Sequence, residues 1–388
     1  MIIQPAEKLE HIQEYYFSRK LREVAQMISK GLPVINLGIG NPDQAPADEV
    51  VKALRKSVED AKNHGYQGYS GIPELREAMS NWYSRTYDVL LDANSEILPL
   101  LGSKEGITHI HQAFLNPGDK VLIPNPGYPT YSSAARLSGA IPVSYDLDEN
   151  NGWAPDWSSV SEEDLKAAKI IWVNYPHMPT GAAGSIEIFK DILKIALKYK
   201  ILVVNDNPYS LVLPEGQPVS FLQLEGAKEA VLELNSLSKS HNLAGARVGM
   251  VVGDSSYINT ILKVKSNVDS GMYKPVQEAA VAALNLPDSW HDARNAVYAS
   301  RLDLAKSIMD AMDCVYSDDH VGMFLWAKIP DTYQHVEDLT EMILHEANVF
   351  VTPGFIFGSK GNRYVRISLC SKNDMLEEAL KRIKSLAL

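Results

Sequence analysis

Reactive side chains follow directly after apolar runs of the sequence. The run 201–206 ends in Asp206, and Tyr209 follows three residues later. A second run, 231–239, ends in Lys239, and Arg247 follows eight residues later. In a doubly wound sheet, ligands bind outside the carboxyl ends of the strands. We therefore expect these side chains to meet at one edge of a sheet, together with the polar residues beside neighbouring runs, which are Ser103, Lys104, Asn174, Ser236 and Ser238.

Together, these residue types could hold a phosphorylated pyridine. The first backbone N–H groups of a predicted helix after Gly102 form a ready anion site. The hydroxyls of Ser236 and Ser238 and the guanidinium of Arg247 suit a phosphate dianion. A lysine beside that site can form a Schiff base, and a carboxylate at a neighbouring strand end can keep a pyridine nitrogen protonated. These are the requirements of pyridoxal 5′-phosphate.

Other interpretations of single motifs are weaker. Ser236-Leu-Ser-Lys239 matches Ser-x-x-Lys, the nucleophile motif of penicillin-recognising serine enzymes, but the chain has no Lys-Thr-Gly. His109 and His111 lie two residues apart, which points their rings to different sides of a helix. The chain has 2 cysteines, too few for a four-cysteine site or a disulfide framework. We therefore expect no metal centre.

The order of the elements predicts an α/β fold. Near-continuous β-branched strands between helices favour a large domain with a mostly parallel sheet that helices cover, and after residue 271 the pattern changes to a smaller α+β arrangement. We predict a large domain over residues 45–280, and a small domain built from residues 1–44 and 281–388, on which the N-terminal helix could pack. The predicted strands are 34–39, 119–124, 141–145, 169–174, 201–206, 231–235, 248–252, 323–328 and 364–369, and the predicted helices are 6–30, 104–115, 186–199, 275–284, 290–312, 335–347 and 373–387.

Several motifs in order carry a family resemblance. The strongest runs from Ser236-Leu-Ser-Lys239 through Ser-His-Asn-Leu-Ala-Gly-Ala to Arg247. Gly102-Ser-Lys-Glu-Gly106, Asn205-Asp-Asn-Pro-Tyr209 and Pro353-Gly-Phe-Ile-Phe-Gly358 support it. Over nearly its whole length the sequence resembles the class I/II aminotransferases, pyridoxal-phosphate-dependent enzymes of fold type I.

The resemblance implies a role for each site residue. Lys239 would form the Schiff base, Asp206 would partner the pyridinium, and Tyr209 would donate to the cofactor's phenolate oxygen. Tyr128, in Pro126-Gly-Tyr-Pro129, would stack on the pyridine ring. The implied phosphate contacts are the backbone N–H groups of Ser103 and Lys104 with Ser236, Ser238 and Arg247, Asn174 is a further cofactor contact, and Arg366 and Gly40 are the implied contacts of the substrate α-carboxylate.

The resemblance also implies a homodimer. Tyr66, five residues before Gly71, matches a tyrosine that reaches the phosphate of the neighbouring subunit. Ser270, in the stretch 265–273, is expected near the same phosphate across the dimer interface. Asp269, Met272 and Tyr273 in that stretch hint at a substrate with a neutral or aromatic side chain.

One position departs from the family pattern. Met178 stands directly before Pro-Thr-Gly181, where the family usually has an asparagine that donates to the phenolate oxygen. A thioether cannot donate a hydrogen bond. Our hypothesis is that the cofactor imine keeps its proton more tightly in this chain.

We therefore expect an aminotransferase of amino acid metabolism that moves an amino group from an L-amino acid to a 2-oxo acid, with 2-oxoglutarate as the expected acceptor. A carbon–sulfur β-lyase or a related synthase on the same fold is an alternative, and a non-catalytic cofactor-binding regulator is a second one.

The formal net charge of −11 argues against nucleic acid as a partner. The N-terminus lacks a secretory pattern and no apolar run is long enough for a membrane span, so we expect a cytoplasmic protein.

Overall fold

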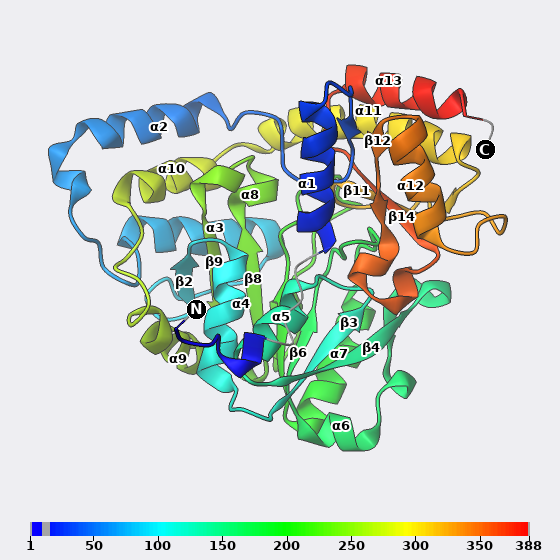
Figure 1. Ribbon diagram of the computed structural model, residues 1–388. Helices are drawn as coiled ribbons and strands as arrows, with labels where there is room; N and C mark the ends of the chain where they lie inside the picture. The colour runs from blue at the N-terminus through cyan, green and yellow to red at the C-terminus, as the bar shows by residue number, and fades with distance from the viewer. Residues whose placement is uncertain (1, 10–15, 387–388) are drawn as a thin grey trace.

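An eight-stranded sheet forms the core of the larger part of the molecule (Figure 1). The computed structural model describes residues 2–9 and 16–386. The strand order is β2-β9-β8-β7-β6-β3-β4-β5. The five strands from β8 to β4 are mutually parallel, whereas β2, β9 and β5 pair antiparallel. This confirms the predicted α/β fold. The strands are β2 (Ile97–Leu100), β3 (Lys120–Asn125), β4 (Ile141–Asp148), β5 (Ala154–Asp156), β6 (Ala168–Val173), β7 (Leu202–Asp206), β8 (Val231–Ser236) and β9 (Gly249–Gly253).

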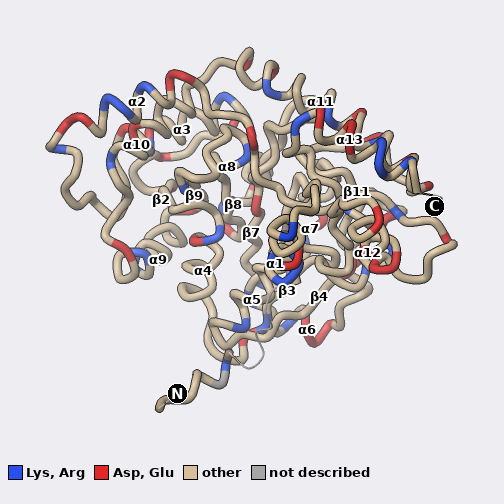
Figure 2. The backbone as a smooth tube through the Cα atoms, turned by 45° about the horizontal axis from the view of Figure 1, so that its top comes forward, with Lys and Arg blue, Asp and Glu red and all other residues tan. Residues whose placement is uncertain are grey.

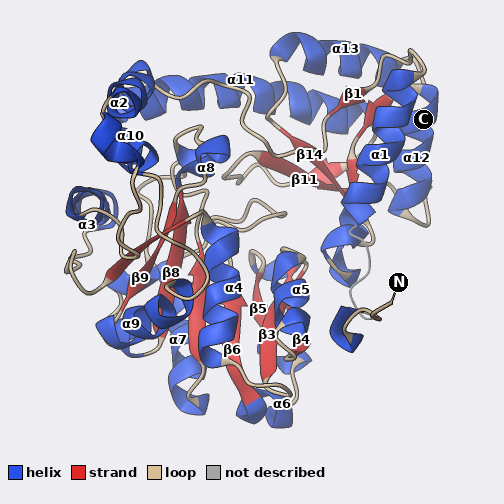
Figure 3. Cartoon of the chain, turned by 60° about the vertical axis from the view of Figure 1, so that its left-hand side comes forward, coloured by secondary structure: helices blue, strands red, loops and turns tan. Residues whose placement is uncertain are grey.

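Helices cover both faces of this sheet (Figure 3). On one face, Ile107 of α4, Tyr131 of α5 and Ile261 of α9 pack on alternate strand residues. On the other face, α3, α7 and α10 pack on the remaining ones. Strands that are buried on both faces are apolar throughout, which explains why the sequence showed them as continuous runs. The helices of this part are α2 (Asp48–Glu59), α3 (Pro73–Tyr87), α4 (Ser103–Phe114), α5 (Thr130–Leu137), α6 (Glu162–Ala167), α7 (Ile186–Tyr199), α8 (Leu237–Ser240), α9 (Ser255–Lys265) and α10 (Lys274–Leu284).

A second, smaller part carries an antiparallel sheet with the order β10-β11-β14-β13, and next to it β1 pairs with β12 in parallel. Helices surround these strands (Figure 3). The apolar cluster around these strands also takes in Met178, Tyr209 and Val212 of the larger part. The division into a large domain over residues 45–280 and a small domain over residues 1–44 and 281–388 stays a prediction. The elements are β1 (Ile35–Asn36), β10 (Val315–Tyr316), β11 (Phe324–Lys328), β12 (Val349–Phe350), β13 (Thr352–Pro353), β14 (Tyr364–Ser368), α1 (Tyr16–Ser29), α11 (Asp288–Ala311), α12 (Val336–Glu346) and α13 (Asn373–Lys384).

The N-terminal helix packs on the C-terminal part of the chain, and Figure 1 shows α1 beside α12. Val24 and Met27 of α1 share a core with Leu344 and Phe350. The Nζ atom of Lys20 lies 2.6 Å from a carboxylate oxygen of Glu341. Residues from opposite ends of the sequence therefore build one unit.

The main differences from the predicted elements lie at the two ends of the chain. The helix predicted over 6–30 is α1, Tyr16–Ser29, preceded by a 3-10 turn at Glu7–Leu9, and residues 10–15 lie outside the described residues. The strand predicted over 34–39 is only Ile35–Asn36. The backbone at Gly38 and Gly40 leaves the pairing because it lies against the rings of Phe350 and Phe324, too close for a Cβ atom. The predicted last helix ends at Lys384, with residue 387 outside the described residues.

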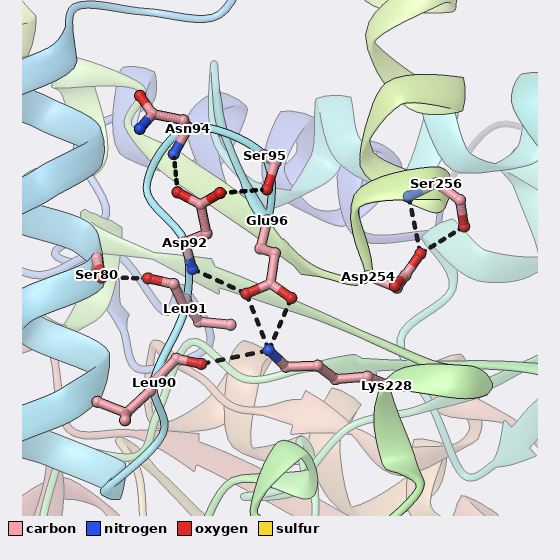
Figure 4. A network of polar contacts seen from close by, with 10 residues as sticks. All are labelled: Ser80, Leu90, Leu91, Asp92, Asn94, Ser95, Glu96, Lys228, Asp254 and Ser256. Atoms are coloured by element: carbon pink, nitrogen blue, oxygen red, sulfur yellow. Dashed lines mark hydrogen bonds and ion pairs between the residues drawn. The ribbon is translucent and has the colours of Figure 1, made fainter.

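A polar network fixes the loop that leads into edge strand β2 (Figure 4). The Nζ atom of Lys228 lies 2.7 and 2.9 Å from the carboxylate oxygens of Glu96, and Glu96 accepts the N–H of Asp92 at 2.8 Å. Asp92 in turn accepts from Asn94 and Ser95 within the loop. These contacts set the start of β2, which leads directly to the N-terminus of α4.

Charged residues of both signs are interspersed along α2, α11 and α13 (Figure 2). Acidic and basic residues nearly balance on these three helices, so the net charge of −11 does not come from them. Within the described residues, no helix is long and apolar enough to cross a membrane.

Candidate active site

A cavity of about 370 Å³ lies at the carboxyl ends of β6, β7 and β8, between the two sheets. Every site residue that the sequence predicted lines this cavity, apart from Tyr66 and Ser270. Arg366 comes from β14 of the smaller sheet and Gly40 from the segment after β1, and the others come from the large sheet, its helices and its loops. The predicted lining residues are Gly40, Ser103, Lys104, Tyr128, Asn174, Asp206, Tyr209, Ser236, Ser238, Lys239, Arg247 and Arg366.

Lys239 lies on the short helix α8, directly after β8. The hydroxyl of Ser236 caps this helix by accepting the N–H of Ser238 at 3.2 Å. The Nζ atom of Lys239 donates to the carbonyl oxygen of Gly40. Burial lowers the pKa of Lys239, and Arg366 and Arg247 lower it further. A lowered pKa leaves more of the amine neutral, and a neutral amine is the nucleophile that Schiff-base formation needs.

Asp206 is a buried carboxylate at the end of β7. The hydroxyl of Tyr131 donates to its Oδ2 atom at 2.9 Å, whereas Oδ1 has no hydrogen-bond partner among the described residues. Burial raises the pKa of Asp206 to about 6, and the hydrogen bond from Tyr131 acts in the opposite direction. A cationic N–H donor that approaches Oδ1 would stabilise the charged form.

The sequence did not single out Tyr131. Its ring is buried and stacks on Trp172, with the ring centroids 4.8 Å apart and the planes at 8°. The indole N–H of Trp172 donates to Nε2 of His111 at 2.7 Å. This stack fixes the Tyr131 hydroxyl against Asp206. The only signal in the sequence is a second tyrosine three residues after Tyr128.

The N-terminus of α4 and three side chains form an anion-binding cup. Gly102 precedes α4 with φ 87°, in the left-handed region that favours glycine. A Cβ atom on Gly102 would overlap the guanidinium of Arg247. Arg247 donates to the hydroxyl of Ser238 at 3.3 Å and to the carbonyl of Leu101 at 3.3 Å. The hydroxyl of Ser103 is buried and lies by the Asp206 carboxyl, whose pKa it lowers, so the anion is left to the backbone N–H groups at the start of α4.

Arg366 lies on β14 with its guanidinium between two phenylalanine rings. The guanidinium carbon is 4.0 Å from the ring centroid of Phe324 and 4.7 Å from that of Phe357. Its Nη2 atom donates to the carbonyl of Gly38 at 2.8 Å, and its Nη1 atom lies 3.2 Å from the sulfur of Met178. The rings fix the plane of the guanidinium, which suits a fork-like contact with a carboxylate.

Three more predicted residues complete the lining. Burial raises the pKa of Tyr209 and of Tyr128, so both phenols stay protonated at neutral pH. The side-chain amide of Asn174 donates to the carbonyls of Asp206 and Pro176 and accepts the N–H of Met178 at 2.9 Å. It joins the ends of β6 and β7, and its predicted cofactor contact stays a prediction.

Tyr66 and Ser270 do not line the cavity of their own chain. Tyr66 is 93% exposed, and Ser270 is also exposed. Their segments lie together, because the backbone at Gly271 touches Gln67 and the hydroxyl of Tyr273 lies 3.1 Å from Nδ1 of His64. Both residues therefore lie on one surface of the molecule, and their contact with a second subunit stays a prediction.

A mostly parallel sheet with a half-buried lysine, a buried carboxylate and an anion cup at its carboxyl edge defines an α/β enzyme of the fold-type I aminotransferase class. The sequence pattern of the family described as "Aminotransferase class I and II" matches residues 33–383. The chain belongs to this family.

Relatives of known name agree over the full length. The chain is 40% identical to an LL-diaminopimelate aminotransferase of Aquifex aeolicus over 385 residues, which are 99% of each protein. A protein of the same name from Dehalococcoides mccartyi is 37% identical over 97% of each. Among solved structures, apo-BacF of Bacillus subtilis matches with a TM-score of 0.94 at 34% identity, over 100% of this chain and 99% of that one. A probable N-succinyldiaminopimelate aminotransferase of Thermus thermophilus matches with a TM-score of 0.88 at 33% identity, over 95% and 99%.

Enzymes of this family depend on pyridoxal 5′-phosphate, and the residues of this chain fit that group. Asp206 has a buried oxygen without a hydrogen-bond partner among the described residues, which suits the pyridine N–H. The N-terminus of α4, Arg247 and the hydroxyl of Ser238 suit the phosphate. The donor set therefore matches both the phosphate and the pyridinium of this group.

The anion cup depends on the missing side chain of Gly102. We expect Gly102→Ala to weaken pyridoxal 5′-phosphate binding by at least about tenfold, because the added Cβ displaces the Arg247 guanidinium. The measurement is an absorbance titration of the cofactor-free protein. Gly118→Ala is the matched control, since Gly118 has φ 88° but nothing within 4 Å of a built Cβ. Equal weakening in both variants would mean that backbone strain, and not the cup, is responsible.

The buried carboxylate makes the cofactor-free protein less stable at neutral pH. Because the folded pKa of Asp206, about 6, lies above its unfolded value of 3.8, folding favours the protonated form, and this contribution is lost as the pH rises through 6. We expect Asp206→Asn to leave the free energy of unfolding unchanged near pH 4 and to raise it by about 3 kcal/mol above pH 7. Urea unfolding across this pH range measures the difference.

Asp92→Asn is the control, because its effect on stability should have the opposite pH dependence. Hydrogen bonds from Ser95 and Asn94 lower the pKa of Asp92. That variant should lose stability toward neutral pH. A stability difference for Asp206→Asn that does not depend on pH would contradict the assignment of a buried, ionising Asp206.

Proposed function

We propose that this chain transfers the amino group of an L-amino acid to 2-oxoglutarate, with pyridoxal 5′-phosphate attached through Lys239. The observation that carries the proposal is the meeting of Lys239, Asp206 and Arg366 in one cavity with the anion cup. We expect this protein to act in the cytoplasm as a homodimer, in which Tyr66 and Ser270 reach the active site of the partner subunit.

Each residue would have one task. Ser103, Ser236, Ser238 and Arg247 would hold the phosphate, and Asp206 would keep the proton on the pyridine nitrogen. When bound, the protonated pyridine ring supplies an electron sink for the electron pair left at the substrate Cα.

The proton transfers would fall to Lys239. Its freed amine would take the proton from the substrate Cα and return it to the C4′ carbon of the cofactor, as general base and then as general acid. Arg366 would bind the α-carboxylate and so decide which bond at Cα stands perpendicular to the ring. The Tyr209 hydroxyl, kept protonated by burial, would donate to the phenolate oxygen.

Two observations favour two different amino donors. LL-diaminopimelate is the first candidate, because curated relatives with 40% and 37% identity carry that substrate in their names. An amino acid with an aromatic or apolar side chain is the second, because Phe324 and Phe357 flank Arg366 and Phe17 and Ile107 also line the cavity. A panel of donors with 2-oxoglutarate as acceptor separates the two by their kcat/KM values.

The amino-transfer function has a direct test. We expect glutamate to form from 2-oxoglutarate and one of these donors, and Lys239→Ala to lower the rate by more than about a thousandfold. Borohydride reduction of the holoenzyme should attach one pyridoxyl phosphate to the peptide that contains Lys239. Lys104→Ala is the control, since Lys104 would act through its backbone N–H and should still be labelled.

Two outcomes would contradict the proposal. Label on another lysine would remove the role of Lys239. Pyruvate and ammonia in place of glutamate would indicate β-elimination on the same scaffold, an alternative that the comparisons do not support.

Met178 gives a separate prediction. Its sulfur lies 3.2 Å from Nη1 of Arg366, in a buried position where a thioether offers no donor. We expect Met178→Asn to lower the pH midpoint of the visible absorbance change of the bound cofactor by about one unit, because an added donor would stabilise the phenolate. Met178→Leu, which keeps the volume and adds no donor, should leave the midpoint in place. The same midpoint in wild type and Met178→Asn would refute the hypothesis.

A further inference from the structure

Arg294 is a buried arginine to which the roles above give no task. It lies on α11 and is 3% exposed. Within the described residues it makes no salt bridge. Its guanidinium carbon lies 5.5 Å from the ring centroid of Trp290, and Trp290 stacks on His241 with the planes at 13°. A buried guanidinium without a carboxylate must gain its stabilisation from hydrogen bonds.

Those hydrogen bonds join two loops of the active site. The Nη1 atom of Arg294 donates to the carbonyl of Ser240, the residue after Lys239. Its Nη2 atom donates to the carbonyl of Leu211, two residues after Tyr209. One planar group thus connects the turn that presents Lys239 to the loop that presents Tyr209.

The loop after β7 is strained and depends on the same helix. Leu213 has φ 47°, an uncommon conformation for a residue with a side chain. Its N–H donates to Oδ1 of Asn295 at 3.2 Å, and Nδ2 of Asn295 donates to the carbonyl of Leu211 at 3.1 Å. Arg294 also donates to Oδ1 of Asn295, at 3.0 Å. Such conformations persist where the surroundings hold them, and here α11 holds them.

We propose that Arg294 is a positioning residue, which fixes the Lys239 turn relative to the Asp206–Tyr209 loop by bridging the carbonyls of Ser240 and Leu211. An arginine suits this task because its two terminal nitrogens diverge in one rigid plane. A lysine ammonium at the same place is a single point donor without this fork, so it does not bridge the two carbonyls. The consequence for catalysis rests on the proposed amino-transfer function, whereas the bridge itself does not.

The bridge is tested by hydrogen exchange in the cofactor-free protein. Protected amides report each loop, since the N–H of Val212 donates to Tyr209 at 2.8 Å and the N–H of Leu243 to Leu237 at 3.2 Å. We expect Arg294→Met to speed exchange in both 207–213 and 238–243 by at least about tenfold.

Arg363→Met is the matched control, because Arg363 donates to the carbonyls of Tyr333, Ile329 and Pro330 and does not line the cavity. It should change neither loop of the site. Unchanged exchange in either loop of Arg294→Met, or equal exchange in the control, overturns the bridge. This measurement tests the Arg294 bridge independently of the proposed amino-transfer reaction.

The holoenzyme tests the consequence for catalysis. We expect Arg294→Met and Arg294→Lys both to lose about 10- to 100-fold in kcat with the donor KM within about threefold. The visible circular dichroism of the bound cofactor should change in both variants, while its affinity stays within about threefold because the anion cup is intact. Wild-type kcat and circular dichroism in Arg294→Lys would show that a positive charge suffices and would overturn the proposal. A wild-type protein without glutamate formation would instead refute the proposed function.

Discussion

The carboxylate of Asp206 is buried at the end of β7 with a hydrogen bond to only one of its two oxygens. A buried carboxylate loses its hydration and is stable in the charged form only where donors or cations replace the lost water. Tyr131 replaces part of it, and Lys239 donates to Gly40 and not to Asp206. The protein alone thus leaves the charge incompletely compensated, which is the environment that a pyridinium would complete.

The sheet topology explains why the compensating groups meet there. The parallel strands β6, β7 and β8 end at one edge, and they bring the segments of Asn174, Asp206 and Ser236 together. Arg366 arrives from the smaller sheet, so the group that would grip the substrate carboxylate and the groups that would hold the cofactor belong to different sheets. A chain with a net charge of −11 in this way places Lys239, Arg247 and Arg366 around one cavity.

The parts of the site that could be predicted from the sequence are those in which neighbouring residues act together. Lys239 and Arg247 share one continuous motif, and Asp206 closes an apolar run, so their positions in the cavity follow from local sequence. Tyr131 and Arg294 could not be found this way. The hydrogen bond of Tyr131 to Asp206 joins residues 75 positions apart, and that of Arg294 to Ser240 depends on how α11 packs. Burial and packing across the fold decide such contacts, and a single sequence does not show them.

Contacts between distant parts of the chain also explain why the first strand is shorter than predicted. The run 34–39 has the composition of a strand, but the site requires the backbone of Gly40 beside Lys239 and Phe324. The chain therefore leaves the pairing after Asn36. Local preference gives way where the backbone itself forms part of the site.

The central claim is that Asp206 holds a proton on the ring nitrogen of the cofactor. The most direct measurement is the nitrogen NMR chemical shift of pyridoxal 5′-phosphate labelled at the ring nitrogen and bound to the wild-type protein at neutral pH. The account predicts the shift of a protonated pyridinium in wild type and that of a neutral pyridine in Asp206→Asn. A neutral ring nitrogen in the wild-type protein would contradict it.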